Sequence, residues 1–121
     1  MAIQSSIEIT GYINNLAAGR LNLDTIAVEN SASISSSTEL ACASGDNTIT
    51  IPTGARGVII TFPTLATTTK RLKGVAGDTG IQVDTTTRGG SFYLLFGASP
   101  GASFVINSSA LDTLKTQFQF F

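Results

Sequence analysis

The sequence of 121 residues contains no histidine, no tryptophan and a single cysteine, Cys42. Without histidine, the chain has no imidazole ligand for zinc, no serine–histidine dyad and no imidazole that titrates near neutral pH. One cysteine cannot form a disulfide within the chain, and the apolar neighbours of Cys42 predict a buried, unreactive thiol. These absences exclude several common kinds of catalytic and metal site.

Charged residues are also scarce. They make up 12% of the chain, about half the usual fraction, and the formal net charge is −1. The only basic cluster is Lys70, Arg71 and Lys73, so we expect no nucleic-acid partner, because a phosphate-binding surface needs many clustered basic side chains. A surface with little charge is typical of proteins that pack against other proteins.

Long apolar runs are missing as well. No stretch approaches the length of a transmembrane helix, and the first residues lack the basic and apolar regions of a signal peptide. We therefore expect no membrane partner and synthesis in the cytoplasm.

Short strand patterns fill most of the chain. The strongest is Gly-Ala-Arg-Gly-Val-Ile-Ile-Thr-Phe at residues 54–62, whose β-branched and aromatic residues predict a central strand between Pro52 and Pro63. Further strands are predicted at residues 3–10, 21–29, 38–43, 71–75, 81–86, 91–96 and 104–106 and at the C-terminal tail, and residues 48–52 are a short β-branched stretch. The pattern predicts an all-β fold, an antiparallel, jelly-roll-like β-sandwich of eight to nine short strands in one domain spanning residues 1–121.

The sequence also predicts the structure of some segments between these strands. Residues 45–47 (Gly-Asp-Asn) predict a turn, and residues 108–112 could form one helical turn capped by serine. The run Ser-Phe-Tyr-Leu-Leu-Phe at residues 91–96 is expected in the core.

Acidic residues offer weak candidates for chemistry. Asp78 and Asp84 are the nearest acidic pair, but a glycosidase needs two carboxyls on facing positions, and these lie on a turn and on the next strand. Asp78 also lies in an Asp-Thr-Gly tripeptide, the sequence that carries the aspartic-protease carboxylate. That chemistry needs two such carboxylates sharing a proton, so one copy per chain could serve only in a two-fold dimer, and Asp78 is more simply a turn residue. Asp46 and Asn47 could donate oxygens to calcium, but calcium needs six to eight oxygens, so a turn is again expected. We predict no catalytic residue, no cofactor and no metal.

Aromatic residues provide two further candidates. Tyr12 and Tyr93 are the only amphipathic rings that could stack on a sugar, and the run around Tyr93 favours the core for it. Phe118, Phe120 and Phe121 end the chain and must be covered, because each buried phenylalanine contributes roughly 1.5–3 kcal/mol. They either complete the chain's own sheet or form a subunit interface.

Three segments resemble small structural proteins of tailed bacteriophages. They are Ile-Thr-Ile-Pro-Thr-Gly-Ala-Arg-Gly-Val-Ile-Ile-Thr at residues 49–61, Leu-Lys-Gly-Val-Ala-Gly-Asp-Thr-Gly-Ile at 72–81, and Ser-Phe-Tyr-Leu-Leu-Phe at 91–96. Such proteins are β-sandwich modules, often trimers, that decorate capsids or build neck and tail parts. The resemblance implies a non-enzymatic capsid decoration (cement) protein in the virion, a homo-oligomer whose partners are the major capsid protein or other virion proteins. A neck or tail accessory role and a host-surface, glycan-binding module are the alternatives.

Overall fold

The computed structural model describes residues 5–10, 12–15, 19–22, 26–30, 36–63, 68–83, 85 and 91–121. All regular elements among these residues are β-strands, and this part of the chain contains no helix that could cross a membrane. The strands are β1 (Ser5–Ile9), β2 (Tyr12–Asn15), β3 (Gly19–Asn22), β4 (Ile26–Asn30), β5 (Ser36–Leu40), β6 (Gly45–Thr50), β7 (Gly57–Thr61), β8 (Lys70–Lys73), β9 (Ile81–Val83), β10 (Ser91–Leu95), β11 (Ser103–Ser108) and β12 (Thr116–Phe120).

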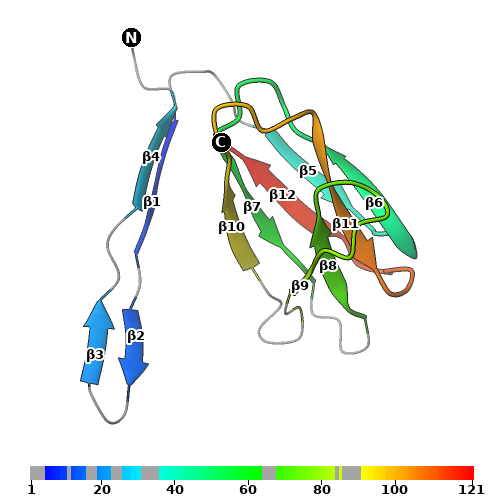
Figure 1. Cartoon of the computed structure of the whole chain (residues 1–121), viewed down its shortest axis with the longest axis horizontal. Coiled ribbons are helices and arrows are strands. Elements are labelled where there is room, and N and C mark those ends of the chain that lie inside the picture. The colour runs from blue at the N-terminus through cyan, green and yellow to red at the C-terminus, as the bar shows by residue number, and fades with distance from the viewer. Residues whose placement is uncertain are drawn as a thin grey trace.

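Strands β5 to β12 form two four-stranded antiparallel sheets (Figure 1). The order is β10-β7-β12-β5 in the first sheet and β6-β11-β8-β9 in the second. The pairing is nested, since β5 pairs with β12, β6 with β11, β7 with β10 and β8 with β9. The chain therefore folds like one long hairpin whose two arms are wrapped into two layers, and the predicted all-β antiparallel sandwich is confirmed.

The core lies between the two sheets. From the first sheet, β7 and β12 turn alternate side chains inward, and β6 and β11 do the same from the second. The buried side chains that they supply include Val58, Ile60, Phe118, Phe120, Ile49, Phe104 and Ile106. The rings of Phe104 and Phe118 have centroids 6.3 Å apart and join the two layers. The prediction of a central strand within residues 54–62 is confirmed, because β7 lies between β10 and β12.

Gly57 begins β7 at a point where no side chain fits. A Cβ atom there would lie 2.6 Å from Cζ of Phe121 and 2.8 Å from the carbonyl oxygen of Leu94. The backbone N–H groups of Arg56 and Gly57 both donate to the carbonyl of Phe121, at 2.7 and 3.2 Å, and Phe121 N–H donates to Gly57 at 3.1 Å. Glycine thus lets the ring of Phe121 pack directly on the backbone of the first sheet.

The remaining strands lie outside the sandwich. β1 pairs with β4 in register Ile7↔Val28 and Ile9↔Ile26, and β2 pairs with β3. We call the β1–β4 pair the N-terminal ladder. Figure 1 shows it standing apart from the sandwich, and no described strand of the sandwich is hydrogen-bonded to it. The structure does not test whether residues 1–121 form one domain, and that expectation stays a prediction.

Two local predictions are wrong. The turn expected at residues 45–47 lies slightly earlier, because the Asn47 side chain bonds to the backbone N–H and carbonyl of Ala43, and β6 already begins at Gly45. The helical turn expected at residues 108–112 is absent. Ser108 ends β11, and its hydroxyl donates to the carbonyl of Ala110 at 2.6 Å instead of capping a helix.

Candidate functional site

Asp78, the candidate protease residue, lies in the exposed turn between β8 and β9. Its Oδ2 atom accepts a hydrogen bond from the backbone N–H of Val75 at 3.3 Å, and its own N–H donates to the Val75 carbonyl at 3.4 Å. These are the bonds of a turn residue, as the sequence indicated. Asp84, the second acid, lies outside the described residues.

Asp46, the candidate calcium ligand, is held by three groups of the protein. Its Oδ1 atom accepts from Lys73 Nζ at 2.9 Å and from Asn107 Nδ2 at 2.7 Å, and its Oδ2 atom accepts from the Gly77 N–H at 3.3 Å. The hydrogen bond from Lys73, followed by that from Asn107, lowers the pKa of the Asp46 carboxyl. The Asn47 amide is bonded to backbone groups instead. No cluster of three metal-ligating side chains occurs in the described part of the chain.

The basic cluster is divided among separate partners. Arg71 Nε donates to the carbonyl of Thr79 at 2.8 Å, Lys73 is paired with Asp46, and Lys70 is fully buried. The three cations therefore do not form one continuous positive surface.

Lys70 and Asp112 form a buried ion pair that the sequence did not predict. Lys70 Nζ lies 3.0 Å from Asp112 Oδ1, and both side chains have no exposed area. Lys70 also donates to Thr68 Oγ1 at 3.2 Å, whereas Asp112 Oδ2 has no hydrogen-bond partner. Such a pair fixes the position of the loop before β12 on β8, because separating the charges leaves one of them alone in the interior.

Cys42 lies in the same region and is fully buried, as the sequence predicted. Its Sγ atom is 3.9 Å from Thr116 Oγ1. Burial raises the pKa of the thiol, so little of the reactive thiolate forms. This cluster therefore holds the fold together and offers no accessible nucleophile.

The C-terminal phenylalanines complete the chain's own sheet. Phe118, Phe120 and Phe121 are 0%, 2% and 7% exposed, and β12 lies between β7 and β5. Of the two alternatives left open by the sequence, the structure shows the completed sheet. A role for these rings in a subunit interface stays a prediction.

Tyr93 is half-exposed, so the expectation that residues 91–96 lie wholly in the core is wrong. β10 is an edge strand, and its residues alternate between the two faces of the first sheet. Tyr93 and Leu95 point outward with 51% and 39% of their surface exposed, while Phe92 and Leu94 turn inward and are partly buried. The other candidate sugar-stacking residue, Tyr12, lies in β2, and its side chain is outside what the structure describes.

The outer face of the first sheet carries little charge. Pairing places four residues in one row across the sheet: Tyr93, Ile59, Gln119 and Ser37. The next row holds Thr61, Gln117 and Glu39, and Glu39 is the only charged residue of either row. This broad, nearly neutral surface was missed by sequence reasoning, because its residues come from four separate segments.

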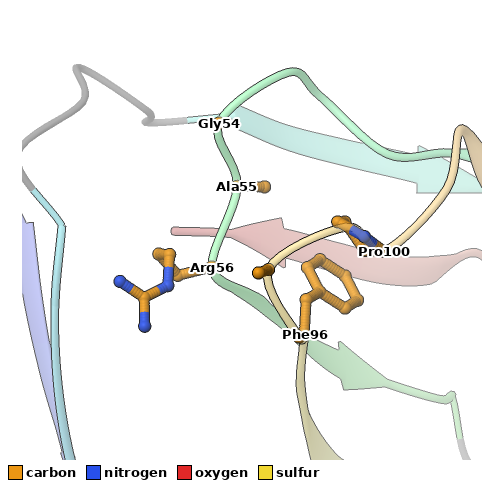
Figure 2. Close-up of a pocket in the computed structure, with 7 residues that line it drawn as sticks. Gly54, Ala55, Arg56, Phe96 and Pro100 are labelled. Carbon is orange, nitrogen blue, oxygen red and sulfur yellow. The ribbon is translucent and has the colours of Figure 1, made fainter.

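A hollow of about 560 Å³ opens at one end of β10. Figure 2 shows Phe96 and Pro100 on one side and the Arg56 side chain directed away from them. The lining residues Gly54, Ala55, Arg56, Phe96, Gly97, Ala98 and Pro100 include no carboxylate. The hollow therefore lacks the groups for acid–base chemistry and has one cation at its rim.

The fold and these surfaces define an antiparallel β-sandwich whose described aspartates, Asp46, Asp78 and Asp112, hold its loops in place. Comparison of the chain with protein-family models, with curated proteins and with solved structures finds no match in any of the three. The function therefore has to be inferred from the residues of the chain.

Proposed function

We propose that this protein is a non-enzymatic structural protein of a bacteriophage virion, a capsid decoration protein that stabilises the shell by burying an interface between subunits. The observation that carries the proposal is the outer face of the first sheet, where Tyr93, Ile59 and Gln119 lie in one row and the one charged residue of the next row, Glu39, is paired with Lys115. Charge is depleted and aromatic residues are enriched at the centres of protein interfaces.

Two further observations support this role. The nested pairing of β5 to β12 is the strand order that a jelly roll requires, and jelly rolls are common among viral capsid domains, so we infer that fold for the sandwich. In addition, the two candidate carboxylates that the structure describes are engaged within the protein, Asp78 in a turn and Asp46 in an ion pair with Lys73. A rigid sandwich with a neutral face suits a protein that works by contact.

The test begins with particles purified from the source of this sequence. The protein should be found by mass spectrometry in intact virions, in a fixed ratio to the major capsid protein. Its absence from all purified particles would overturn the proposed role.

The docking face is then tested with two matched substitutions. Gln119→Lys places a charge in the centre of the outer face of the first sheet, whereas Thr48→Lys places the same charge on an exposed position of β6 in the second sheet. Both variants should fold, and only Gln119→Lys should fail to bind capsids that lack the protein. Equal binding by both variants would show that another face is used.

A glycan-binding module is the second candidate, favoured by the exposed ring of Tyr93. An exposed aromatic face can stack on a sugar ring and covers large apolar area with few rotatable bonds. Binding to a glycan array that is lost in Tyr93→Ala would support it, and absence of binding by the wild-type protein would rule it out in favour of the structural role.

A further inference from the structure

β10 is an unprotected sheet edge. Among the described strands it pairs only with β7, and its five residues, Ser-Phe-Tyr-Leu-Leu, include no charge and no proline. The other edge strands differ, because β5 carries Glu39, β6 carries Asp46 and β9 has only three residues. Natural sheets usually block their edges with charge, proline or short strands, so an apolar edge such as β10 is suited to pairing with another strand.

The free backbone groups of this edge can be assigned. Phe96 N–H donates to the carbonyl of Arg56 at 2.9 Å. The backbone N–H and carbonyl groups of Phe96, and of the alternate residues Leu94 and Phe92, therefore point toward β7. In an antiparallel pair the N–H and carbonyl of one residue point the same way and successive residues alternate. The backbone groups of Tyr93 and Leu95 therefore face away from the sheet.

The N-terminal ladder is the complementary fragment. A two-stranded ladder is marginal in water, because it has no second layer and both outer edges are unpaired. The register pairs Ile7 with Val28 and Ile9 with Ile26, so aliphatic residues stand opposite one another along the two strands. On the inward side of β10, Phe92 and Leu94 are only partly buried, and an added aliphatic strand would continue that layer.

The β10 edge and the N-terminal ladder also carry opposite charges. Arg56 lies where β10 ends, its side chain is directed away from Phe96 and Pro100 (Figure 2), and it makes no ion pair with any side chain that the structure describes. The strands of the ladder contain Glu8 and Glu29 and no basic residue. An acidic ladder placed along β10 brings its charge to Arg56, the cation that the structure describes at that edge.

We propose that the β10 edge of one molecule receives the N-terminal ladder of a second copy of this chain, which extends the first sheet by strand addition. Neither described strand of the chain's own ladder is hydrogen-bonded to β10. Main-chain hydrogen bonds to Tyr93 and Leu95 hold the added strand, as in other cases of strand addition to a sheet edge. This inference does not depend on a role in virions.

Tyr93→Pro tests the edge directly. Proline removes the outward N–H of Tyr93 but none of the bonds to β7, and proline is tolerated on edge strands. Tyr93→Val is the matched control, since it removes the ring and keeps the N–H. The wild-type chain and Tyr93→Val should associate in light scattering, whereas the dissociation constant of Tyr93→Pro should rise about tenfold or more.

Hydrogen exchange identifies the added strand. The amides of Tyr93 and Leu95 should become protected as the concentration of the full-length protein is raised, together with amides of β1 or β4. Protection that does not change with concentration in a monomer would mean that the chain's own ladder binds the edge, and would overturn the proposal. Association without protection of these amides would overturn it too, because a different surface would then be in contact.

Charge reversal provides an independent check. Arg56→Glu should weaken association a few-fold at low salt, and combining it with Glu8→Arg and Glu29→Arg should restore the lost affinity. If the triple variant binds more weakly than Arg56→Glu alone, the ladder does not lie beside Arg56 and the proposed arrangement is wrong.

Discussion

Lys70 and Asp112 show how one pair of residues can hold distant segments. They lie 42 residues apart in sequence, yet their charged atoms are 3.0 Å apart with no exposed area. The carboxylate keeps one oxygen without a partner, so the pair is not fully satisfied. The contribution of this ion pair to folding stability therefore depends on both charges being present.

Removing one member of this pair should be more damaging than removing both. Lys70→Met should lower the free energy of unfolding by roughly 3–5 kcal/mol, because it leaves a buried carboxylate without its cation. The double variant Lys70→Met/Asp112→Leu should recover most of that loss. Urea denaturation of the wild type and both variants measures this, and a double variant less stable than the single one would contradict the argument.

Asp46 should make the folding stability of the protein depend on pH in the acid range. Its pKa in the folded protein lies below the ordinary value of 3.8, because Lys73 and Asn107 donate hydrogen bonds to the ionised form. The stabilisation is therefore present above the ordinary pKa and is lost as pH falls through the lowered pKa of the folded state.

The expected result is a difference in melting temperature between wild type and Asp46→Asn at neutral pH that shrinks as pH falls below 3.8. Lys73→Met should reduce the same pH dependence, because it removes the largest cause of the shift. A difference that stays constant down to pH values well below 3.8 would show that the carboxyl is not tuned by these bonds.

Some residue roles could be predicted from the sequence and others could not. The turn role of Asp78 and the burial of Cys42 follow from their immediate neighbours, and the structure confirms both. The burial of Asp112 could not be predicted, because its partner Lys70 lies on β8, far away in the sequence. In addition, the serine residues before Asp112 favoured a helical cap. Sequence periodicity carries local preferences, whereas ion pairs depend on which strands become neighbours.

Among the elements, β12 has the largest role in the core. It pairs with β7 on one side and β5 on the other, and its residues alternate between buried phenylalanine and exposed glutamine. Phe118 also contacts Phe104 of the second sheet. This strand therefore joins three strands of one sheet to the opposite layer.

Adjacent residues of β12 should respond very differently to truncation. Phe118→Ala should cost roughly 3–5 kcal/mol of unfolding free energy, because it leaves a cavity in the core. Gln119→Ala, the control on the same strand, should change stability by no more than about 0.5 kcal/mol, because its side chain is exposed. Similar losses in the two variants would mean that β12 does not have the predicted inward and outward faces.

The difference between a central strand and an edge strand explains why residues 91–96 were wrongly predicted to lie in the core. Residues 54–62 and residues 91–96 both read as continuous apolar runs, and both form strands. Only the first lies inside a sheet with neighbours on both sides. A short apolar run predicts a strand well, but its position in the sheet depends on topology, which local patterns do not encode.

For the whole molecule, the structure separates a layered sandwich from a two-stranded ladder. The fold class was predictable because turn residues and alternation recur along the chain, whereas the nested strand order was not, because it depends on pairing between distant segments. The nearly neutral outer face could not be predicted either, because pairing between distant segments brings its residues together from β5, β7, β10 and β12.

The two parts should differ in local stability. In dilute solution, amides of β7 and β12 should exchange only through global unfolding, whereas those of β1 and β4 should exchange at least about a hundredfold faster, because an isolated ladder opens easily. Hydrogen exchange measured by mass spectrometry at low protein concentration checks this. Equal protection of both parts would instead support a single cooperative domain over residues 1–121.

The nested pairing also affects how the protein is made. β5 is the first sandwich strand to be synthesised, and its only partner in the sheet, β12, is the last. While the ribosome is still translating the intervening residues, β5 has no strand to pair with and β7 lacks one of its two neighbours. The first sheet can therefore close only after β12 has left the ribosome, so a nascent chain stalled before β12 would be a substrate for chaperones or proteases.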